Sequence, residues 1–134
     1  MESLPMLDRL QLKGNKLSTL FGVDLNHNSR LTFLDLSSNN IKQLPQHFLD
    51  KTQVSTLKLA NNKIRSISNE TLSGVEGMLK YLDLAYNDLE ELSHVGLSAV
   101  ETLYLDGMLT IRGILTLVPT FRNIQLTISA NTSF

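Results

Sequence analysis

The stretch LTFLDLSSNNI, residues 31–41, decides the fold. It has leucine or isoleucine at its first, fourth, sixth and eleventh positions and an asparagine, Asn39, at its ninth. An asparagine is ordinarily a turn or surface residue. If the same offsets recur along the chain, however, Asn39 belongs to a repeat and needs a structural reason for its place in an apolar pattern.

The offsets do recur. Residues 7–17, 54–64 and 79–89 read LDRLQLKGNKL, VSTLKLANNKI and LKYLDLAYNDL, and two weaker copies follow at residues 100–110 and 121–131. Their starts are separated by 24, 23, 25, 21 and 21 residues. A motif of this form with a period of about 20–29 residues resembles the leucine-rich repeat family, and the resemblance covers nearly the whole chain.

The residues themselves predict strands. The Leu-x-Leu segments alternate with period two, as a strand with one buried face does. No unit can bury its apolar face alone, so successive units must stack and their strands form one parallel sheet. The expected inward residues of the strands are Leu10, Leu12, Leu34, Leu36, Leu57, Leu59, Leu82 and Leu84. Further inward residues are expected after each strand, at Leu20, Leu44, Ile67 and Leu92, and on the outer segment, at Leu25, Phe48 or Leu49, Leu72 and Leu97.

The resemblance implies an α/β-type solenoid, a right-handed superhelix with one parallel β-sheet, a mostly irregular convex side and about six coils. The coils start near residues 7, 31, 54, 79, 100 and 121 of a single array over residues 1–134. The chain has no cysteine and no helix-length segment for a cap at its start. Because solenoids need capped ends, we expect this array to be a segment of a larger protein.

The recurring asparagines predict an inward ladder formed by Asn15, Asn39, Asn62 and Asn87. An inward asparagine must be hydrogen-bonded, and its amide has the donors and acceptor to satisfy the turn backbone of its own and the neighbouring coil. Leaving such a buried group unpaired costs about 1–3 kcal/mol. Met108 and Ser129 replace the asparagine in the last two copies, so the regular pattern is expected to fail there.

The outward residues between the leucines pave one face of the predicted sheet, and the resemblance implies that a protein ligand or co-receptor binds this face. The implied binding residues are Arg9, Gln11, Phe33, Asp35, Thr56, Lys58, Tyr81, Asp83, Tyr86, Thr102, Tyr104 and Asp106. The outward residues are expected to form three columns. The first column is Arg9, Phe33, Thr56, Tyr81, Thr102 and Asn123, the central column is Gln11, Asp35, Lys58, Asp83, Tyr104 and Gln125, and the third column is Lys13, Ser37, Ala60, Ala85, Asp106 and Thr127. Exposed aromatic residues favour an interface, although strand propensity also explains them. The alternating charges fit recognition or a ladder that only stabilises the sheet.

The composition argues against several other classes of function. Lys and Arg total 12 and Asp and Glu total 13, so the chain lacks the basic surplus of a nucleic-acid binder. It has no apolar run long enough to span a membrane and no signal-peptide pattern at its start. His27, His47 and His94 fall at different repeat offsets, and no phosphate-loop or nucleophile motif is present. We expect no enzyme activity, cofactor or metal site.

The residues alone are compatible with more than one cellular compartment. Late Leu or Phe in a unit of about 24 residues resembles the class found in animal extracellular proteins, such as Toll-like receptors and secreted insect immune proteins. That resemblance implies an ectodomain of an innate-immune or cell-surface receptor, with candidate glycosylation sites at Asn69 and Asn131. The lack of cysteine favours a cytoplasmic scaffold or regulatory subunit instead. A third alternative is a structural spacer, or a segment that self-associates through uncapped ends.

Overall fold

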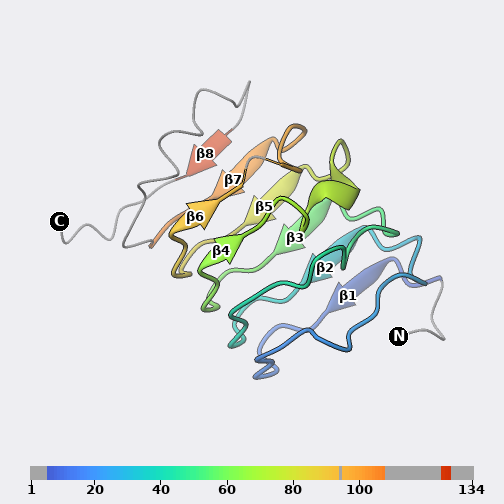
Figure 1. Ribbon diagram of the computed structural model, residues 1–134, viewed down its shortest axis with the longest axis horizontal. Coiled ribbons are helices and arrows are strands. Elements are labelled where there is room, and N and C mark those ends of the chain that lie inside the picture. Colours follow the sequence, from blue (N-terminus) through green and yellow to red (C-terminus); the bar gives the residue numbers. More distant parts are fainter. Residues whose placement is uncertain (1–5, 94, 108–124, 128–134) are drawn as a thin grey trace.

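The computed structural model describes residues 6–93, 95–107 and 125–127. Short parallel strands stack side by side into one six-stranded sheet with the order β1-β2-β3-β5-β7-β8 (Figure 1). All neighbouring strands pair in parallel, and their central leucines are in register from Leu10 to Leu126. The strands are β1 (Arg9–Gln11), β2 (Phe33–Asp35), β3 (Thr56–Lys58), β5 (Tyr81–Asp83), β7 (Thr102–Tyr104) and β8 (Gln125–Thr127).

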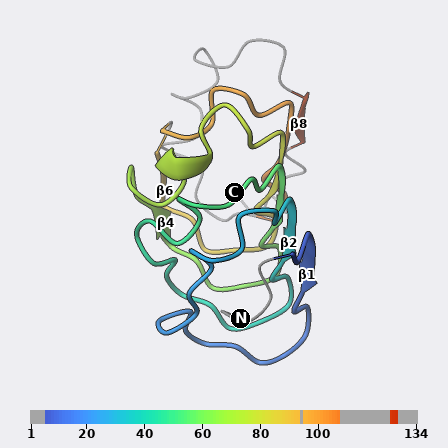
Figure 2. The same cartoon turned by 90° about the vertical axis from the view of Figure 1, so that its right-hand side faces the viewer.

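Among the residues that the structure describes, the opposite side of the molecule has little regular structure. It carries the 3-10 turn η1 (Ser73–Val75) and two short strands, β4 (Ser66–Ile67) and β6 (Glu91–Leu92), which pair in parallel. Figure 2 shows these strands on the other side of the solenoid from the main sheet. The predicted solenoid with a parallel sheet and an irregular second side is confirmed. The described residues complete about four turns, from β1 to β7, where about six coils were expected.

The core is a column of leucines between these two sides. Every predicted inward leucine in or directly after β2, β3 and β5 is at most 2% exposed, and the four residues expected further along each coil are at most 9% exposed. On the outer segment, Phe48 and Leu49 were predicted as alternative core residues, and both are buried. In the first coil Leu10 and Leu12 are only half-buried, although they contact the core cluster. The first coil therefore contributes less burial than the coils that have neighbours on both sides.

Asn62 lies between the second and third coils and bonds to both of them. Its Oδ1 accepts a hydrogen bond from the amide of Ile41 at 3.0 Å. Its Nδ2 donates to the carbonyl oxygens of Leu36 and Leu59, both at 3.0 Å, and of Ala60 at 3.4 Å. With 7% exposure Asn62 is a buried polar residue whose amide replaces water as the partner of the bending backbone.

Asn39 and Asn87 repeat this arrangement. Asn87 accepts from the amide of Ile64 and donates to carbonyl oxygens of the third and fourth coils. Asn39 accepts from two amides of the first coil, those of Asn15 and Leu17, each at 2.9 Å. Each of these asparagines thus ties its own turn to the preceding coil, as the recurring offset requires.

Asn15 does not lie as predicted. It is exposed, and its Nδ2 donates only locally, to the carbonyl oxygen of Lys13 at 3.2 Å. The physical reason is position, because an inward rung exchanges hydrogen bonds with a preceding coil, and Asn15 stands on the first coil that the structure describes. The ladder in the described residues therefore has three buried rungs. Met108 and Ser129, where the pattern was expected to fail, lie outside the described residues.

Each turn also contains a residue in the left-handed backbone conformation, which the sequence analysis did not predict. The residue just before the ladder position has a positive φ in every described coil, between 57° and 74°. Glycine adopts this left-handed conformation at little cost, whereas other residues adopt it at a cost of about 1–2 kcal/mol. The sharp bend after each strand thus depends on one left-handed residue and one asparagine together. The left-handed residues are Gly14, Ser38, Asn61, Tyr86 and Gly107.

Candidate functional site

Side chains of the first and central outward columns of the main sheet form a chain of ring contacts. The guanidinium carbon of Arg9 lies 3.9 Å from the ring centre of Phe33. The amine of Lys58 lies 5.6 Å from the ring centre of Phe33 and 5.8 Å from that of Tyr81. The rings of Tyr81 and Tyr104 are 5.5 Å apart at an angle of 54°. Such tilted ring pairs and cations over rings each contribute about 0.5–1.5 kcal/mol. These contacts leave the three rings half-buried.

The central column alternates in charge, as the sequence shows, but it does not form a ladder of ion pairs. Within the described part of the chain, the ion pairs join His47 to Asp50 and Arg65 to Glu90, and Lys58 takes part in neither. The carboxylates of the column bond to backbone instead. Asp35 accepts from the amide of Ser37 at 2.9 Å, and Asp83 accepts from the amide of Ala85 at 3.1 Å.

In the third outward column, three small residues are largely buried among their neighbours. Ser37, Ala60 and Ala85 are only 6%, 9% and 5% exposed. Their side chains are small, so the neighbouring longer side chains stand above them. The result is a hollow in the sheet face with a volume of about 330 Å³. Its walls and floor are formed by Lys13, Asp35, Ser37, Ser38, Lys58, Ala60, Asn61, Asp83, Ala85, Tyr86, Tyr104 and Asp106.

The structure thus gathers half of the predicted binding residues around one hollow, namely Asp35, Lys58, Asp83, Tyr86, Tyr104 and Asp106. The other half lie elsewhere on the same sheet. Arg9 and Gln11 are exposed on β1, and Phe33, Thr56, Tyr81 and Thr102 are half-buried in the first column. Sequence reasoning missed Ser38 and Asn61 at the rim. The recurring turn position just before each ladder asparagine was the signal that could have identified them.

Burial and neighbouring charge set the protonation of two side chains on this face. Burial raises the pKa of the Asp83 carboxyl, and the nearby carboxylates of Asp35 and Asp106 raise it further. The amide of Ala85 and the charge of Lys58 act in the opposite direction. Burial first, and the neighbouring Tyr104 second, raise the pKa of Tyr81 to about 12. For Asp83, burial together with the two carboxylates therefore outweighs the Ala85 amide and Lys58 and leaves the pKa raised.

Tyr86 stands at the rim of the hollow in a costly conformation. It is 52% exposed and has a φ of 57°, which is unusual for a bulky residue. Its ring lies over Gly107 of the next coil, where an added Cβ atom would be 2.3 Å from the ring. The absence of a side chain at Gly107 is what lets the Tyr86 ring lie there.

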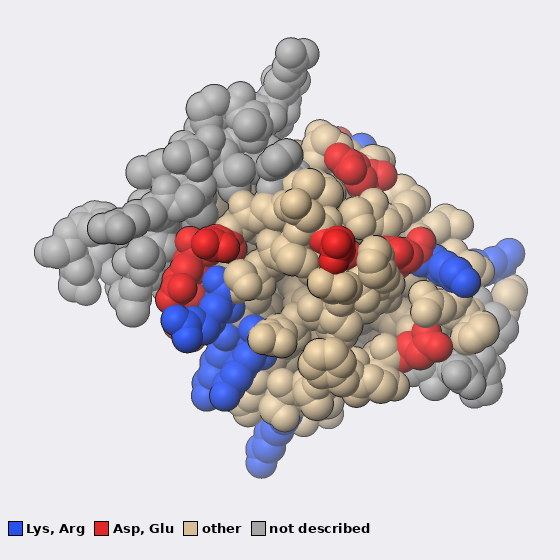
Figure 3. All heavy atoms as spheres, in the orientation of Figure 1, with Lys and Arg blue, Asp and Glu red and all other residues tan. Residues whose placement is uncertain are grey.

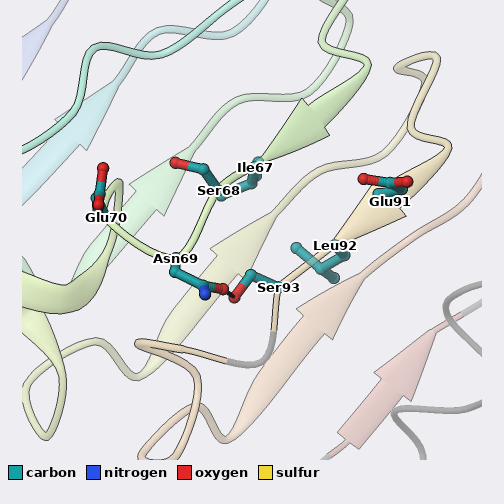
Figure 4. A pocket seen from close by; sticks show the side chains of 7 residues that line it. All are labelled: Ile67, Ser68, Asn69, Glu70, Glu91, Leu92 and Ser93. Atoms are coloured by element: carbon teal, nitrogen blue, oxygen red, sulfur yellow. Dashed lines mark hydrogen bonds between the residues drawn. The ribbon is translucent and has the colours of Figure 1, made fainter.

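The candidate glycosylation site Asn69 lies on the side opposite the main sheet. It is exposed and borders a second hollow, of about 470 Å³, beside β4 and β6. Its Oδ1 accepts a hydrogen bond from the hydroxyl of Ser93, and the two side chains point toward each other in Figure 4. Basic side chains gather at one edge of this side, next to acidic ones (Figure 3). Asn131 lies outside the described residues.

Residues of the kinds that bind metals do not converge in the described part of the chain. Among those residues no group of three His, Asp or Glu side chains is placed to hold a metal ion. His47 bonds to Asp50 at 2.8 Å, whereas His94 is outside the described residues.

No helix of the described ranges has the length and apolar character needed to cross a membrane.

Comparison with known proteins agrees with this geometry. A family model for the Leucine rich repeat matches residues 29–89 and 52–107. Part of Toll-like receptor 10 from Bos taurus is 32% identical over 108 residues, which cover 77% of this chain and 13% of the receptor. Lumican from Rattus norvegicus is 34% identical over 108 residues, which cover 63% of this chain and 31% of lumican.

A third relative, leucine-rich repeat serine/threonine-protein kinase 1 from Caenorhabditis elegans, is 30% identical over 92 residues, 67% of this chain and 4% of the kinase. The chain thus spans between 4% and 31% of the length of these relatives.

Two solved structures share the fold. An internalin from Listeria monocytogenes superposes with a TM-score of 0.69 at 24% identity, over 98% of this chain and 37% of the internalin. A leucine-rich repeat protein of Leptospira interrogans superposes with a TM-score of 0.67 at 22% identity, over 94% of this chain and 38% of that protein. The repeat offsets, the stacked parallel strands, the asparagine ladder and a family model that matches more than half of the residues lead to one conclusion: this chain belongs to the leucine-rich repeat family.

Proposed function

We propose that this chain is a non-catalytic recognition module that binds a protein ligand on the outward face of its main sheet. The observation that supports this proposal most strongly is the hollow in that face, bordered by Tyr86, Tyr104 and the carboxylates of Asp35, Asp83 and Asp106. Tyrosines beside a concave surface are favoured anchors of protein interfaces. Leucine-rich repeats are protein-recognition modules, and relatives of this chain include a receptor.

The conformation of Tyr86 gives independent support. A bulky residue in the left-handed region costs free energy that the surrounding structure must offset. Glycine occupies the equivalent turn position in the first and fifth coils, at Gly14 and Gly107, where it avoids this cost. An exposed tyrosine at such a position does not serve the core, and strained residues cluster at binding sites. A role in recognition explains why a tyrosine occupies position 86, whereas a contribution to stability does not.

A map of photo-crosslinks would test which face binds. A photoreactive phenylalanine analogue would be placed at position 104, at position 86, or at the exposed Phe21 away from the main sheet. In cells that produce the parent protein, we expect one protein to crosslink from positions 86 and 104 and not from position 21. A protein that crosslinks only from position 21 would instead place recognition on the other side.

We propose further that the parent protein is an extracellular or cell-surface receptor of innate immunity or a related process. Support comes from the similarity to Toll-like receptor 10 and from the exposed Asn69 in an Asn-Glu-Thr sequence. Thr71 of this sequence is 2% exposed, and its hydroxyl lies 3.1 Å from that of Ser68. Because the Thr71 side chain is buried in the fold, we propose that a glycan is added before this segment folds.

Secretion from an animal cell tests this assignment. We expect the secreted chain to lose mass on treatment with a glycosidase that removes N-linked glycans, and Asn69→Gln to abolish part or all of that loss. Asn131→Gln serves as the matched control, because it removes only the second candidate sequence. Secreted wild-type and Asn69→Gln chains with the same glycosidase response would contradict glycosylation at Asn69.

A further inference from the structure

The hollow in the sheet face has the chemistry of a receptor for a single basic side chain. Its volume of about 330 Å³ lies at the small end of the range of about 300–1,000 Å³ for ligand pockets. A strand or helix is too large for it, whereas one long side chain fits. The small residues Ser37, Ala60 and Ala85 create this depth, because longer side chains at those positions would fill it.

The charges around the hollow favour a cation. Three carboxylates, of Asp35, Asp83 and Asp106, line it together with two amines, of Lys13 and Lys58. The amine of Lys58 lies near the rings of Phe33 and Tyr81, and Lys58 forms no ion pair with another described residue. Asp83 is half-buried, and the carboxylates of Asp106 and Asp35 repel its charge, whereas the Ala85 amide and Lys58 stabilise it. A cation that enters the hollow would relieve this repulsion.

The rings at the hollow indicate which cation fits. Tyr104 borders it from β7, and Tyr86 borders it from the turn after β5. A guanidinium group stacks on aromatic faces and donates paired hydrogen bonds to carboxylates, whereas an ammonium group is a compact and strongly hydrated charge. A site that combines two tyrosine rings with carboxylates therefore suits arginine better than lysine.

We propose that the hollow receives an arginine side chain of the protein ligand, with the carboxylates of Asp83 and Asp106 opposite the guanidinium and the rings of Tyr86 and Tyr104 beside it. This inference rests on the proposed function and names the chemistry of the partner at that site. It also explains the strained backbone of Tyr86, because the left-handed turn brings its ring to the rim of the hollow.

The test uses the full chain and a small probe, N-acetyl-arginine methylamide, with the citrulline analogue as its uncharged control. Amide NMR shifts would be followed as each compound is added. We expect saturable shifts at Ala85 and Tyr86 with the arginine compound and none with the citrulline compound. Equal shifts with both compounds, or no shift with either, would overturn the assignment of an arginine subsite.

Two charge variants strengthen the test. Asp83→Asn keeps an oxygen that can accept from the Ala85 amide, and we expect it to weaken binding of the arginine probe about fivefold. Lys58→Gln removes the competing positive charge, and we expect it to tighten binding about threefold. Asp24→Asn, whose carboxylate accepts from the Asn26 amide away from the hollow, should leave the affinity unchanged.

Affinities for the probe that do not change in Asp83→Asn would contradict the proposal. The photo-crosslinks from positions 86 and 104 distinguish a failure of the arginine subsite from a failure of the proposed function. If those crosslinks form but the arginine probe does not bind, the sheet face still binds a protein and only the arginine subsite is wrong. If the crosslinks form only from position 21, the proposed function itself is wrong.

Discussion

Asn62→Ala is expected to lower the free energy of unfolding by about 2–4 kcal/mol, a large share of the stability of a small domain. The substitution leaves the buried amide of Ile41 without its acceptor, because the Oδ1 of Asn62 is the atom that it bonds to at 3.0 Å. A buried unpaired amide costs about 1–3 kcal/mol. The space vacated by the carboxamide between two coils adds to this cost.

The carbonyl oxygens that Asn62 serves lose less, because each has a second donor. Leu36 O also accepts from Asn39, and Leu59 O also accepts from Asn87. Ala60 O accepts from the amide of Ser38 at 2.8 Å. Each of these carbonyl oxygens thus keeps a hydrogen-bond donor when Asn62 is lost, whereas the Ile41 amide loses its acceptor. We therefore assign most of the cost of Asn62→Ala to the unpaired Ile41 amide.

Asn15→Ala is the matched control, since it makes the same substitution at the exposed member of the series. Its side chain bonds only to the carbonyl oxygen of Lys13 nearby, so we expect a loss within about 0.5 kcal/mol. Urea unfolding followed by far-UV circular dichroism measures both variants. Equal losses for Asn15→Ala and Asn62→Ala would show that the asparagines act through their local turns and not by joining coils.

The sequence predicts the core and the strands well, because the same physical demand recurs in every coil. Leu34 and Leu36 bury their side chains, and Phe33 and Asp35, which alternate with them, face outward, as the period of two requires. A single LDLSSNN segment would not distinguish a turn asparagine from an inward one. Repetition favours the inward role, because the asparagine then keeps a constant distance from the buried leucines in successive coils.

The parts that the sequence did not predict depend on neighbours and on side-chain size. Asn15 matches the motif fully, yet it is exposed because an inward rung exchanges hydrogen bonds with a preceding coil, and Asn15 stands on the first coil that the structure describes. Ser37 lies at an outward position of the pattern, yet its small side chain is covered by longer neighbours. The hollow follows from this difference in size between adjacent columns. The pairing of β4 with β6 likewise depends on how two outer segments meet, and their residues carry no motif for it.

Tyr104→Ala is expected to weaken binding of the protein ligand about thirtyfold, the scale of a central interface residue. Tyr104 borders the hollow, contacts the ring of Tyr81 and stands on the inner strand β7. Truncation removes a wall of the hollow and the ring that would lie beside the ligand. It removes little from the core, because Tyr104 is half-buried on the outward face, so we expect the free energy of unfolding to fall by only about 1 kcal/mol.

Calorimetric titration of the partner that crosslinks from position 104 tests the central claim most directly. The claim is that inward residues maintain the coil stack and outward residues recognise the ligand. We predict that Tyr104→Ala weakens affinity about thirtyfold, while Phe21→Ala, which removes a 72% exposed ring on another surface, leaves affinity unchanged. Unchanged affinity in Tyr104→Ala together with a loss in Phe21→Ala would contradict the account.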